Sequence, residues 1–234
     1  GSEVCDRPEV KCVFAGSGYN RVMGARFTAS GADAIVGRVV ARLDTLGIDA
    51  LWYVGSTAAP GLGAVLERHG FVYRSEWKSM SLDLTAFSSG SGLPAGLEIR
   101  EAESNKDLDA WAEIVVASYG LGDDVHRNYG RHLIARGNAN FKRHHFLGLL
   151  DDRPVATILF FEGKEAAGIY WVGTLPEARH RGIAGAMTCH ALREAKKAGY
   201  GRATLNASAA GHPLYLRIGF ADYHTAGIYH RKGR

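Results

Sequence analysis

Cysteine is scarce in this sequence, and it has neither a long apolar run nor a block of like charges. Its three cysteines, Cys5, Cys12 and Cys189, form no Cys-x-x-Cys pair, which excludes a disulfide scaffold and a cysteine-rich zinc site. No stretch approaches the roughly 20 apolar residues of a spanning helix. Gly1 and Ser2 resemble a cloning remnant, and no secretory leader follows them. We therefore expect a cytoplasmic protein without a membrane partner.

The overall composition is that of an ordinary globular protein, with 46% apolar and 22% charged residues among 234. This length suits one large domain or two small ones. Lys and Arg number 28 against 24 Asp and Glu, which gives a net charge of +4 and a pI near 9.0. The cations alternate with acids or stand alone, whereas a nucleic-acid surface needs them clustered on one face. A nucleic-acid partner is therefore the least favoured function.

A stretch rich in Gly and Ser at 88–96 predicts a linker between an N-terminal part, 1–87, and a C-terminal part, 97–234. The C-terminal part alternates between strand and helix patterns, which predicts an α/β (α+β) fold with a mixed sheet flanked by helices. The predicted strands are 97–100, 144–150, 154–161, 166–174, 202–207 and 220–230, and the predicted helices are 105–118, 123–137, 182–198 and 212–218.

The N-terminal part resembles a worn copy of the second half of this pattern. It predicts a helix at 32–46, a strand at 50–54, a short helix at 63–69 and a strand at 78–84. Gly70-Phe71 matches Gly219-Phe220, and Leu66 then stands where Tyr215 stands in the other copy. We interpret this as a degenerate repeat whose first strands are absent.

The most informative segment runs from the predicted strand that ends at Thr174 into the helix that starts near Gly182. Small residues and cations gather where backbone N–H groups at a helix start lack partners, which favours binding of a pyrophosphate. The alternative is a basic strand–loop–helix turn without a ligand; neither a Walker A loop nor a GxGxxG loop is present. The predicted anion site comprises Arg179, His180, Arg181, Gly182, Ile183, Ala184 and Gly185.

Two motifs in register resemble the GNAT superfamily of acyl-CoA-dependent N-acyltransferases. Arg179-x-x-Gly182-x-Ala184 matches the family's Arg/Gln-x-x-Gly-x-Gly/Ala motif and follows a Pro-Glu-x-Arg approach at 176–179. Downstream, Leu214–Phe220 resembles its Leu-Tyr-x-x-x-Gly-Phe segment. The resemblance covers about residues 97–229, and the partial N-terminal copy resembles tandem-GNAT proteins with one inactive half. It implies a GNAT-like mixed sheet.

The resemblance also implies a function and a set of site residues. The implied function is transfer of an acetyl group from acetyl-CoA, with no metal, to a primary amine of a small molecule or peptide. The alternative is a CoA-binding sensor or scaffold without turnover. The residues implied to bind acetyl-CoA are Val172, Gly173, Thr174, Arg179, His180, Arg181, Gly182, Ile183, Ala184, Gly185, Ser208 and Tyr215.

Within this set, Tyr215 is implied to be the general acid for the departing thiolate, and the Val172 N–H to meet the thioester oxygen. A phenol of pKa near 10 is protonated at neutral pH and can donate; the alternative for Tyr215 is an aromatic packed under a short helix. His180 stands where the family often has Gly. Ser208 stands where the family often has Asn, and Asn206 lies two positions earlier.

The general base and the acceptor stay open. Glu162 and Tyr170 are candidates, as are Asp123, Asp124 and His126, although a helix N-cap explains the Asp pair equally well. A water chain is a further alternative. His144-His145 indicates a strand edge rather than a metal site, because no ligand partners have suitable spacing. The sequence also leaves a homodimer open.

Overall fold

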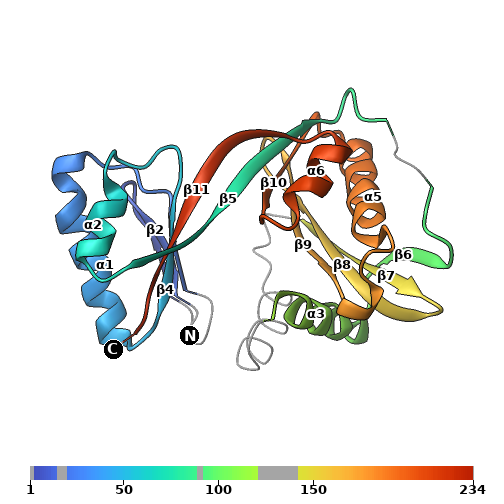
Figure 1. The fold of residues 1–234 in the computed structure, drawn as a ribbon, viewed down its shortest axis with the longest axis horizontal. Helices are drawn as coiled ribbons and strands as arrows, with labels where there is room; N and C mark the ends of the chain where they lie inside the picture. The colour runs from blue at the N-terminus through green and yellow to red at the C-terminus, as the bar shows by residue number, and fades with distance from the viewer. Residues whose placement is uncertain (1–2, 15–19, 89–91, 121–141, 234) are drawn as a thin grey trace. The chain divides into compact units, whose positions relative to one another are not determined.

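The computed structural model describes residues 3–14, 20–88, 92–120 and 142–233 (Figure 1). The chain divides into two compact units. Unit 1 comprises Gly1–Ser79 with Tyr223–Arg234, and unit 2 comprises Met80–Asp222. No helix in the described ranges is long and apolar enough to cross a membrane.

In unit 1, two helices lie on one side of a sheet whose strand order is β1-β2-β3-β4-β11-β5 (Figure 1). Strands β1 to β3 are antiparallel neighbours, whereas β3 and β4 run parallel. The core is aliphatic and aromatic and includes Trp52, Leu66 and Phe71. The elements of the N-terminal half are β1 (Glu3–Asp6), β2 (Lys11–Phe14), β3 (Asn20–Met23), η1 (Ala29–Gly31), α1 (Ala32–Leu46), β4 (Ala50–Val54), α2 (Leu62–Arg68) and β5 (Val72–Asp83).

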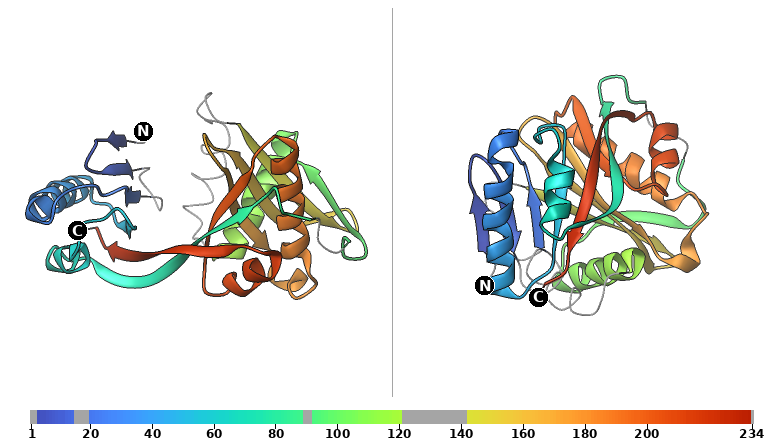
Figure 2. Two further views of the ribbon diagram at one scale, coloured as in Figure 1. Left: turned by 90° about the horizontal axis from the view of Figure 1, so that it is seen from above. Right: turned by 60° about the vertical axis from the view of Figure 1, so that its left-hand side comes forward.

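In unit 2, the strand order is β5-β10-β9-β8-β7-β6. Alternate residues of β8 belong to two clusters: Ile158 and Phe160 pack with α5, and Leu159 packs with α3. The helices therefore cover opposite faces of the sheet (Figure 2). The elements of the C-terminal half are β6 (Leu97–Glu101), α3 (Asn105–Tyr119), β7 (Arg143–Leu150), β8 (Arg153–Glu162), β9 (Ala167–Thr174), η2 (Pro176–Ala178), α5 (Ile183–Lys197), β10 (Arg202–Ala207), α6 (His212–Ile218) and β11 (Ala221–Arg231).

The two halves of the sequence share helix lengths and a turn. Helices α1 and α5 each have 15 residues, and α2 and α6 each have seven. After each short helix a left-handed glycine turns the chain, and the following Phe donates its N–H back into the helix: Phe71 to the Leu66 carbonyl and Phe220 to the Tyr215 carbonyl, both at 3.0 Å. The two halves thus share local geometry, with a leucine in one where the other has a tyrosine.

One expectation about the repeat is wrong. We expected the first strands of the N-terminal copy to be absent, but β1, β2 and β3 precede α1 and pair in the same antiparallel sequence as β7, β8 and β9. These strands have only four residues each, too few for a clear alternating pattern. The predicted helix at 123–137 lies outside the described residues.

The last strand of each sequence half runs into the other unit: β11 belongs to unit 1 from Tyr223 onward, and β5 belongs to unit 2 from Met80 onward. Strand β11 pairs antiparallel with β4 in unit 1, from Gly227 opposite Val54 to Arg231 opposite Ala50. Reciprocally, β5 lies beside β10 in unit 2, where Met80, Leu82 and Leu84 join the core. The two units therefore differ from the two sequence halves.

A buried ion pair fastens β11 to unit 1. Arg231 is 5% exposed, and its guanidinium lies 2.8 Å from a carboxylate oxygen of Asp44 in the last turns of α1. It also donates to the His69 carbonyl beyond α2 at 3.1 Å. A single arginine near the C-terminus thus joins both helices of unit 1.

Candidate active site

A bulge in β9 lies at the centre of the candidate site. The register against β8 shifts so that Leu159 faces Tyr170 while Thr157 faces Gly173. Between these two pairs, two residues of β9 therefore oppose a single residue of β8. Trp171 in the bulge has φ +53°, a conformation that bulky side chains rarely adopt. The Thr157 hydroxyl donates to the Trp171 carbonyl at 3.0 Å and holds this conformation.

Beyond the bulge β9 separates from β10. In this parallel pair Ala203 lies opposite Ala167 and Thr204 lies opposite Gly168, near the start of both strands. Strand β9 continues to Thr174 and β10 to Ala207 beyond those paired residues. The backbone of Val172, Gly173 and Thr174 therefore lies beyond the paired residues, where the two strands diverge.

The predicted anion site forms one continuous turn into α5. Arg179, His180, Arg181 and Gly182 are exposed, whereas Ile183 is buried and Ala184 and Gly185 are half-buried. Gly182 has φ +76° and His180 φ +62°. The left-handed geometry at His180 explains why glycine is often found at that position in the family.

The start of α5 leaves backbone donors available. The first helical bond runs from the Ala186 N–H to the Gly182 carbonyl at 3.1 Å, and within the described ranges no side chain caps this end. In contrast, Ser104 caps α3 by accepting from the Asp107 N–H. The free N–H groups and the helix dipole at α5 together favour an anion.

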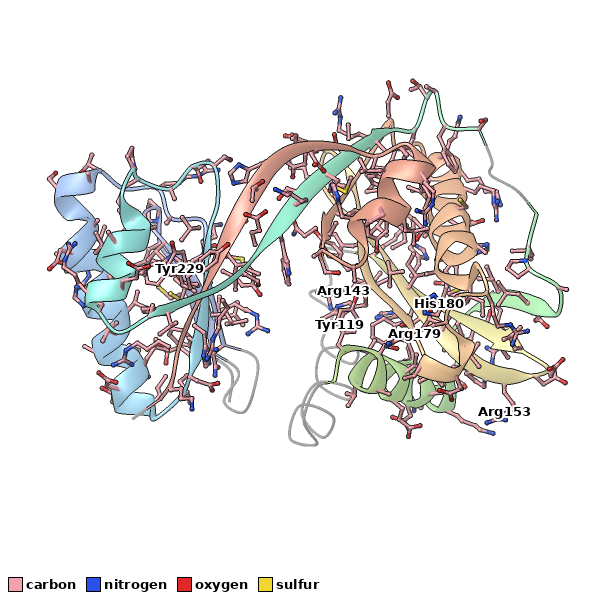
Figure 3. The ribbon with its side chains drawn as sticks, in the orientation of Figure 1. Tyr119, Arg143, Arg153, Arg179, His180 and Tyr229 are labelled. Carbon is pink, nitrogen blue, oxygen red and sulfur yellow. The ribbon has the colours of Figure 1, made fainter. Side chains whose placement is uncertain are left out.

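Arg179 donates two hydrogen bonds to backbone carbonyls next to the candidate site. Its Nε donates to the Thr174 carbonyl at 3.1 Å, and one Nη donates to the Ser118 carbonyl at 3.2 Å. The guanidinium thus joins the end of β9 to the last turn of α3, and two of its five donors are occupied. Figure 3 shows Arg179, His180 and Tyr119 in the same region of unit 2, next to α3.

Tyr119, which sequence reasoning missed, reaches the bulge from the end of α3. Its hydroxyl donates to the Val172 carbonyl at 3.2 Å, and its ring meets Trp171 edge-on at a centroid distance of 5.5 Å. Burial raises the pKa of the Tyr119 phenol to about 12, so the phenol remains a donor. The one local signal was Gly120, which ends α3 with φ +61° and marks Tyr119 as a helix terminus.

Tyr215 lies in α6 and is 8% exposed, in the same core against which Val172 and Leu214 pack. Its ring meets Phe220 edge-on at 5.9 Å and covers the backbone of Gly211, where an added Cβ would lie 3.0 Å from the ring. Burial raises the pKa of the phenol well above its usual value, and the nearby Tyr119 raises it further. Tyr215 is therefore a protonated phenol over the whole neutral range.

The remaining residues predicted for the site lie at different places in unit 2. The Ser208 hydroxyl accepts from the Gly211 N–H at 3.2 Å. Ser208 is exposed just after β10, and Asn206 is exposed within the strand. Glu162 pairs in register with Ala167, five residues before Val172, which is about 16 Å of extended strand. Asp123, Asp124 and His126 lie outside the described residues.

His144 is engaged by carboxylates on both sides. Its Nδ1 lies 2.9 Å from Glu101 and its Nε2 lies 2.9 Å from Glu162. It stands in β7, which pairs with both β6 and β8, so it joins three strands rather than lying on an edge strand. The described residues contain no group of three or more side chains suited to hold a metal ion.

The bulge leads to a testable prediction at Gly173. A Cβ there would lie 2.9 Å from the Thr157 Oγ1 and 3.0 Å from the Ser118 Oγ, and the bond from Thr157 to the Trp171 carbonyl restrains the first of these neighbours. We expect Gly173→Ala to lower the free energy of unfolding by about 1–3 kcal/mol through overpacking. Urea denaturation measures this effect. Gly201→Ala is the control, because a Cβ at Gly201 meets nothing within 4 Å. Equal effects of both substitutions would contradict a tightly packed bulge.

Comparison with known proteins finds a family match in the C-terminal half of the chain. Residues 108–220 match the sequence model of the acetyltransferase (GNAT) family. No curated protein matches the sequence. The match spans most of α3, the bulged strand, the cationic loop and α6, so every residue of the candidate site falls inside it. The chain therefore carries a GNAT-family acetyltransferase domain.

Solved structures share the fold over nearly the whole chain. A GCN5-related N-acetyltransferase from Kribbella flavida has a TM-score of 0.77 at 18% identity and covers 100% of this chain and 91% of its own. One from Sphaerobacter thermophilus has a TM-score of 0.70 at 18% identity, with coverages of 99% and 76%. A tandem GNAT protein from the clavulanic acid biosynthesis pathway has a TM-score of 0.65 at 14% identity, with coverages of 95% and 78%. At these identities the similarity shows the fold, which is a mixed α/β GNAT architecture in two halves.

Proposed function

We propose that this protein transfers an acetyl group from acetyl-CoA to the primary amine of a small molecule or peptide, by direct attack of the amine on the thioester. The observation that carries the proposal is the diverging β9–β10 pair next to the uncapped, cationic start of α5. A diverging pair exposes backbone groups to an extended amide chain, and the helix start attracts a pyrophosphate. Pantetheine joined to a pyrophosphate has this combination of groups.

In this proposal the CoA pyrophosphate binds the N–H groups of Ile183, Ala184 and Gly185, with the exposed Arg179, His180 and Arg181 around it. The pantetheine arm bonds to the backbone of Val172 and Thr174, and Ser208 supplies a hydroxyl from the opposite strand. The carbonyls of Val172 and Thr174 already accept from Tyr119 and Arg179. Since a carbonyl oxygen has two lone pairs, each can accept a second bond.

The chemical step needs a neutral amine, a donor for the developing oxyanion and a proton for the leaving thiolate. The Val172 N–H supplies the oxyanion donor in this proposal, and Tyr215 supplies the proton. The structure separates Glu162 from Val172 along the sheet, so the amine proton leaves by another route. Tyr170, which is 40% exposed on β9, and a water chain are the candidates for that route.

We assign the activity to residues 97–234, with the segment around Met80–Leu84 completing the core. Residues 1–87 form a copy that lacks the acid, because Leu66 stands in its place, and that lacks a CoA site, because the start of α1 does not have the Arg-x-x-Gly-x-Ala spacing. Helix α1 also starts differently: Gly31 has φ −90°, whereas Gly182 has φ +76°. A cytoplasmic location is part of the proposal and rests on the cysteine content.

The proposal is tested with purified protein, acetyl-CoA and a panel of amines, following the release of free thiol. We expect thiol release that requires both substrates, together with an acetylated amine in the mass spectrum. Saturable binding of CoA without thiol release for any amine would favour a CoA-binding sensor instead. No binding of CoA would refute both functions.

A charge reversal locates the anion site in the same experiment. Arg181 is exposed in the loop before α5, and Arg181→Glu should weaken CoA binding about tenfold, because one charge-assisted contact to phosphate is lost. Arg153→Glu is the matched control: Arg153 is also exposed, and Figure 3 shows it away from His180. An equal loss in both variants would mean that general charge, rather than this loop, attracts CoA.

A further inference from the structure

A pair of cysteines on neighbouring strands of unit 1 has the geometry of a disulfide site. Cys5 in β1 and Cys12 in β2 stand directly opposite each other in the antiparallel register. Opposed residues of such a pair have Cα atoms about 4.5 or 5.5 Å apart. A disulfide accepts Cα separations of about 4.4–6.8 Å. Both side chains face the core side of the sheet, because directly opposed residues share a face.

The two thiols differ in access and in protonation. Cys12 is 2% exposed, whereas Cys5 is half-buried near the edge of the sheet. Burial, and then the neighbouring Cys5 thiol, raise the pKa of Cys12 to about 12, so Cys12 is a neutral thiol within hydrogen-bonding reach of Cys5. A reagent from solution therefore reaches Cys5 first, and Cys12 lies where a second thiol must stand to complete an exchange.

Such a bond would connect an edge strand of the sheet to its neighbour. Strand β1 has four residues and stands at one end of the strand order, beside β2. A side-chain ion pair between Glu3 and Arg42 also connects it to α1. A bond between Cys5 and Cys12 would fix this edge strand to the sheet independently of its hydrogen bonds.

We propose that Cys5 and Cys12 form a reversible intramolecular disulfide by exchange with a low-molecular-weight disulfide such as glutathione disulfide. The Cys5 thiolate attacks one sulfur of the reagent, which gives a mixed disulfide and releases one thiolate. The Cys12 sulfur then gives up its proton, attacks the Cys5 sulfur and releases the second thiol. Two protein thiols are oxidised by two electrons, and one reagent disulfide is reduced to two thiols. This site is separate from the acetyl-transfer site and does not depend on the proposed function.

The test treats the native, full-length protein with glutathione disulfide and then titrates thiols in denaturant. Of the three cysteines, one titratable thiol should remain, and the intact mass should fall by two hydrogen atoms. Trypsin does not cleave between Arg7 and Pro8 but cleaves after Lys11. The bond should therefore join the peptides 1–11 and 12–21. Hydrogen exchange across residues 3–14 should slow in the oxidised protein.

Three variants make the result specific. Cys189→Ala should still lose two thiols. Cys12→Ala should retain glutathione on Cys5, because the thiol that completes the exchange is missing, and Cys5→Ala should remain reduced because Cys12 is buried. A stable glutathione adduct on the unmodified sequence, a cross-link to Cys189, or three thiols remaining after treatment would each overturn the proposal.

Discussion

Tyr215→Phe should lower kcat for acetyl transfer about 10²–10⁴-fold, the range typical of a lost general acid. The substitution removes one oxygen and leaves the ring, so the edge-on contact with Phe220 and the cover over Gly211 remain. Binding of CoA should change little, because all but one of the residues implied to contact acetyl-CoA are unchanged. The comparison is made at several pH values up to about 10, since burial raises the pKa of Tyr215 and the phenol stays protonated throughout.

Tyr119→Phe separates the two phenols of this site. Tyr119 bonds to the Val172 carbonyl and also raises the pKa of Tyr215, so its loss affects the site without removing the proposed acid. If Tyr215→Phe retains full turnover while Tyr119→Phe loses it, the general acid is Tyr119 and the assignment is wrong. If Tyr215→Phe loses CoA binding as well as turnover, the phenol acts in binding rather than in proton transfer.

Met80→Ala should lower the stability of unit 2 by about 2–5 kcal/mol, the usual cost of removing a large side chain from a packed core. Met80 is fully buried and belongs to the same core cluster as Tyr215 and Phe220, although it comes from the N-terminal half of the sequence. Urea denaturation measures the loss. Hydrogen exchange then assigns it, with amides of β8 to β10 expected to lose protection before those of β1 to β3.

Met23→Ala is the matched control for this experiment. Met23 ends β3 in unit 1 and is 37% exposed, so its truncation removes little buried surface and should cost well under the Met80 value. A loss of protection in unit 1 alone after Met80→Ala would contradict the exchange of strands between the two halves. Equal losses from both methionines would show that Met80 does not support the core as its burial indicates.

Local signals were enough for most helices and for the cationic loop. Helix α1 was predicted with its observed bounds because Ile35, Val39 and Leu43 repeat at helical spacing and Gly47 follows with φ +63°. Strand β10 and helix α6 were likewise predicted with their observed bounds. These features depend on residues within one or two turns of each other, so the sequence carries them directly.

No local sequence pattern predicted the bulge in β9 or the contacts around it. A register shift between Thr157 and Leu159 depends on two strands that are each regular in sequence, and neither shows which residue is extra. The contact of Tyr119 with Val172 joins residues 53 positions apart. The pairing of β4 with β11 joins segments that are far apart in the sequence, such as Val54 and Gly227, which no local pattern encodes.

The sequence by itself was enough to predict three features of this protein: a cationic loop at a helix start, a tyrosine on a short helix, and a second copy in which leucine replaces that tyrosine. Only the tertiary structure decided which strands pair, where β9 bulges, that Tyr119 meets the candidate site and that Cys5 faces Cys12. The physical reason is that backbone hydrogen bonds between strands are the same for every residue type. The partner of each strand and the register of each pair are therefore selected by the packing of side chains far apart in the sequence, such as Met80 and Arg231.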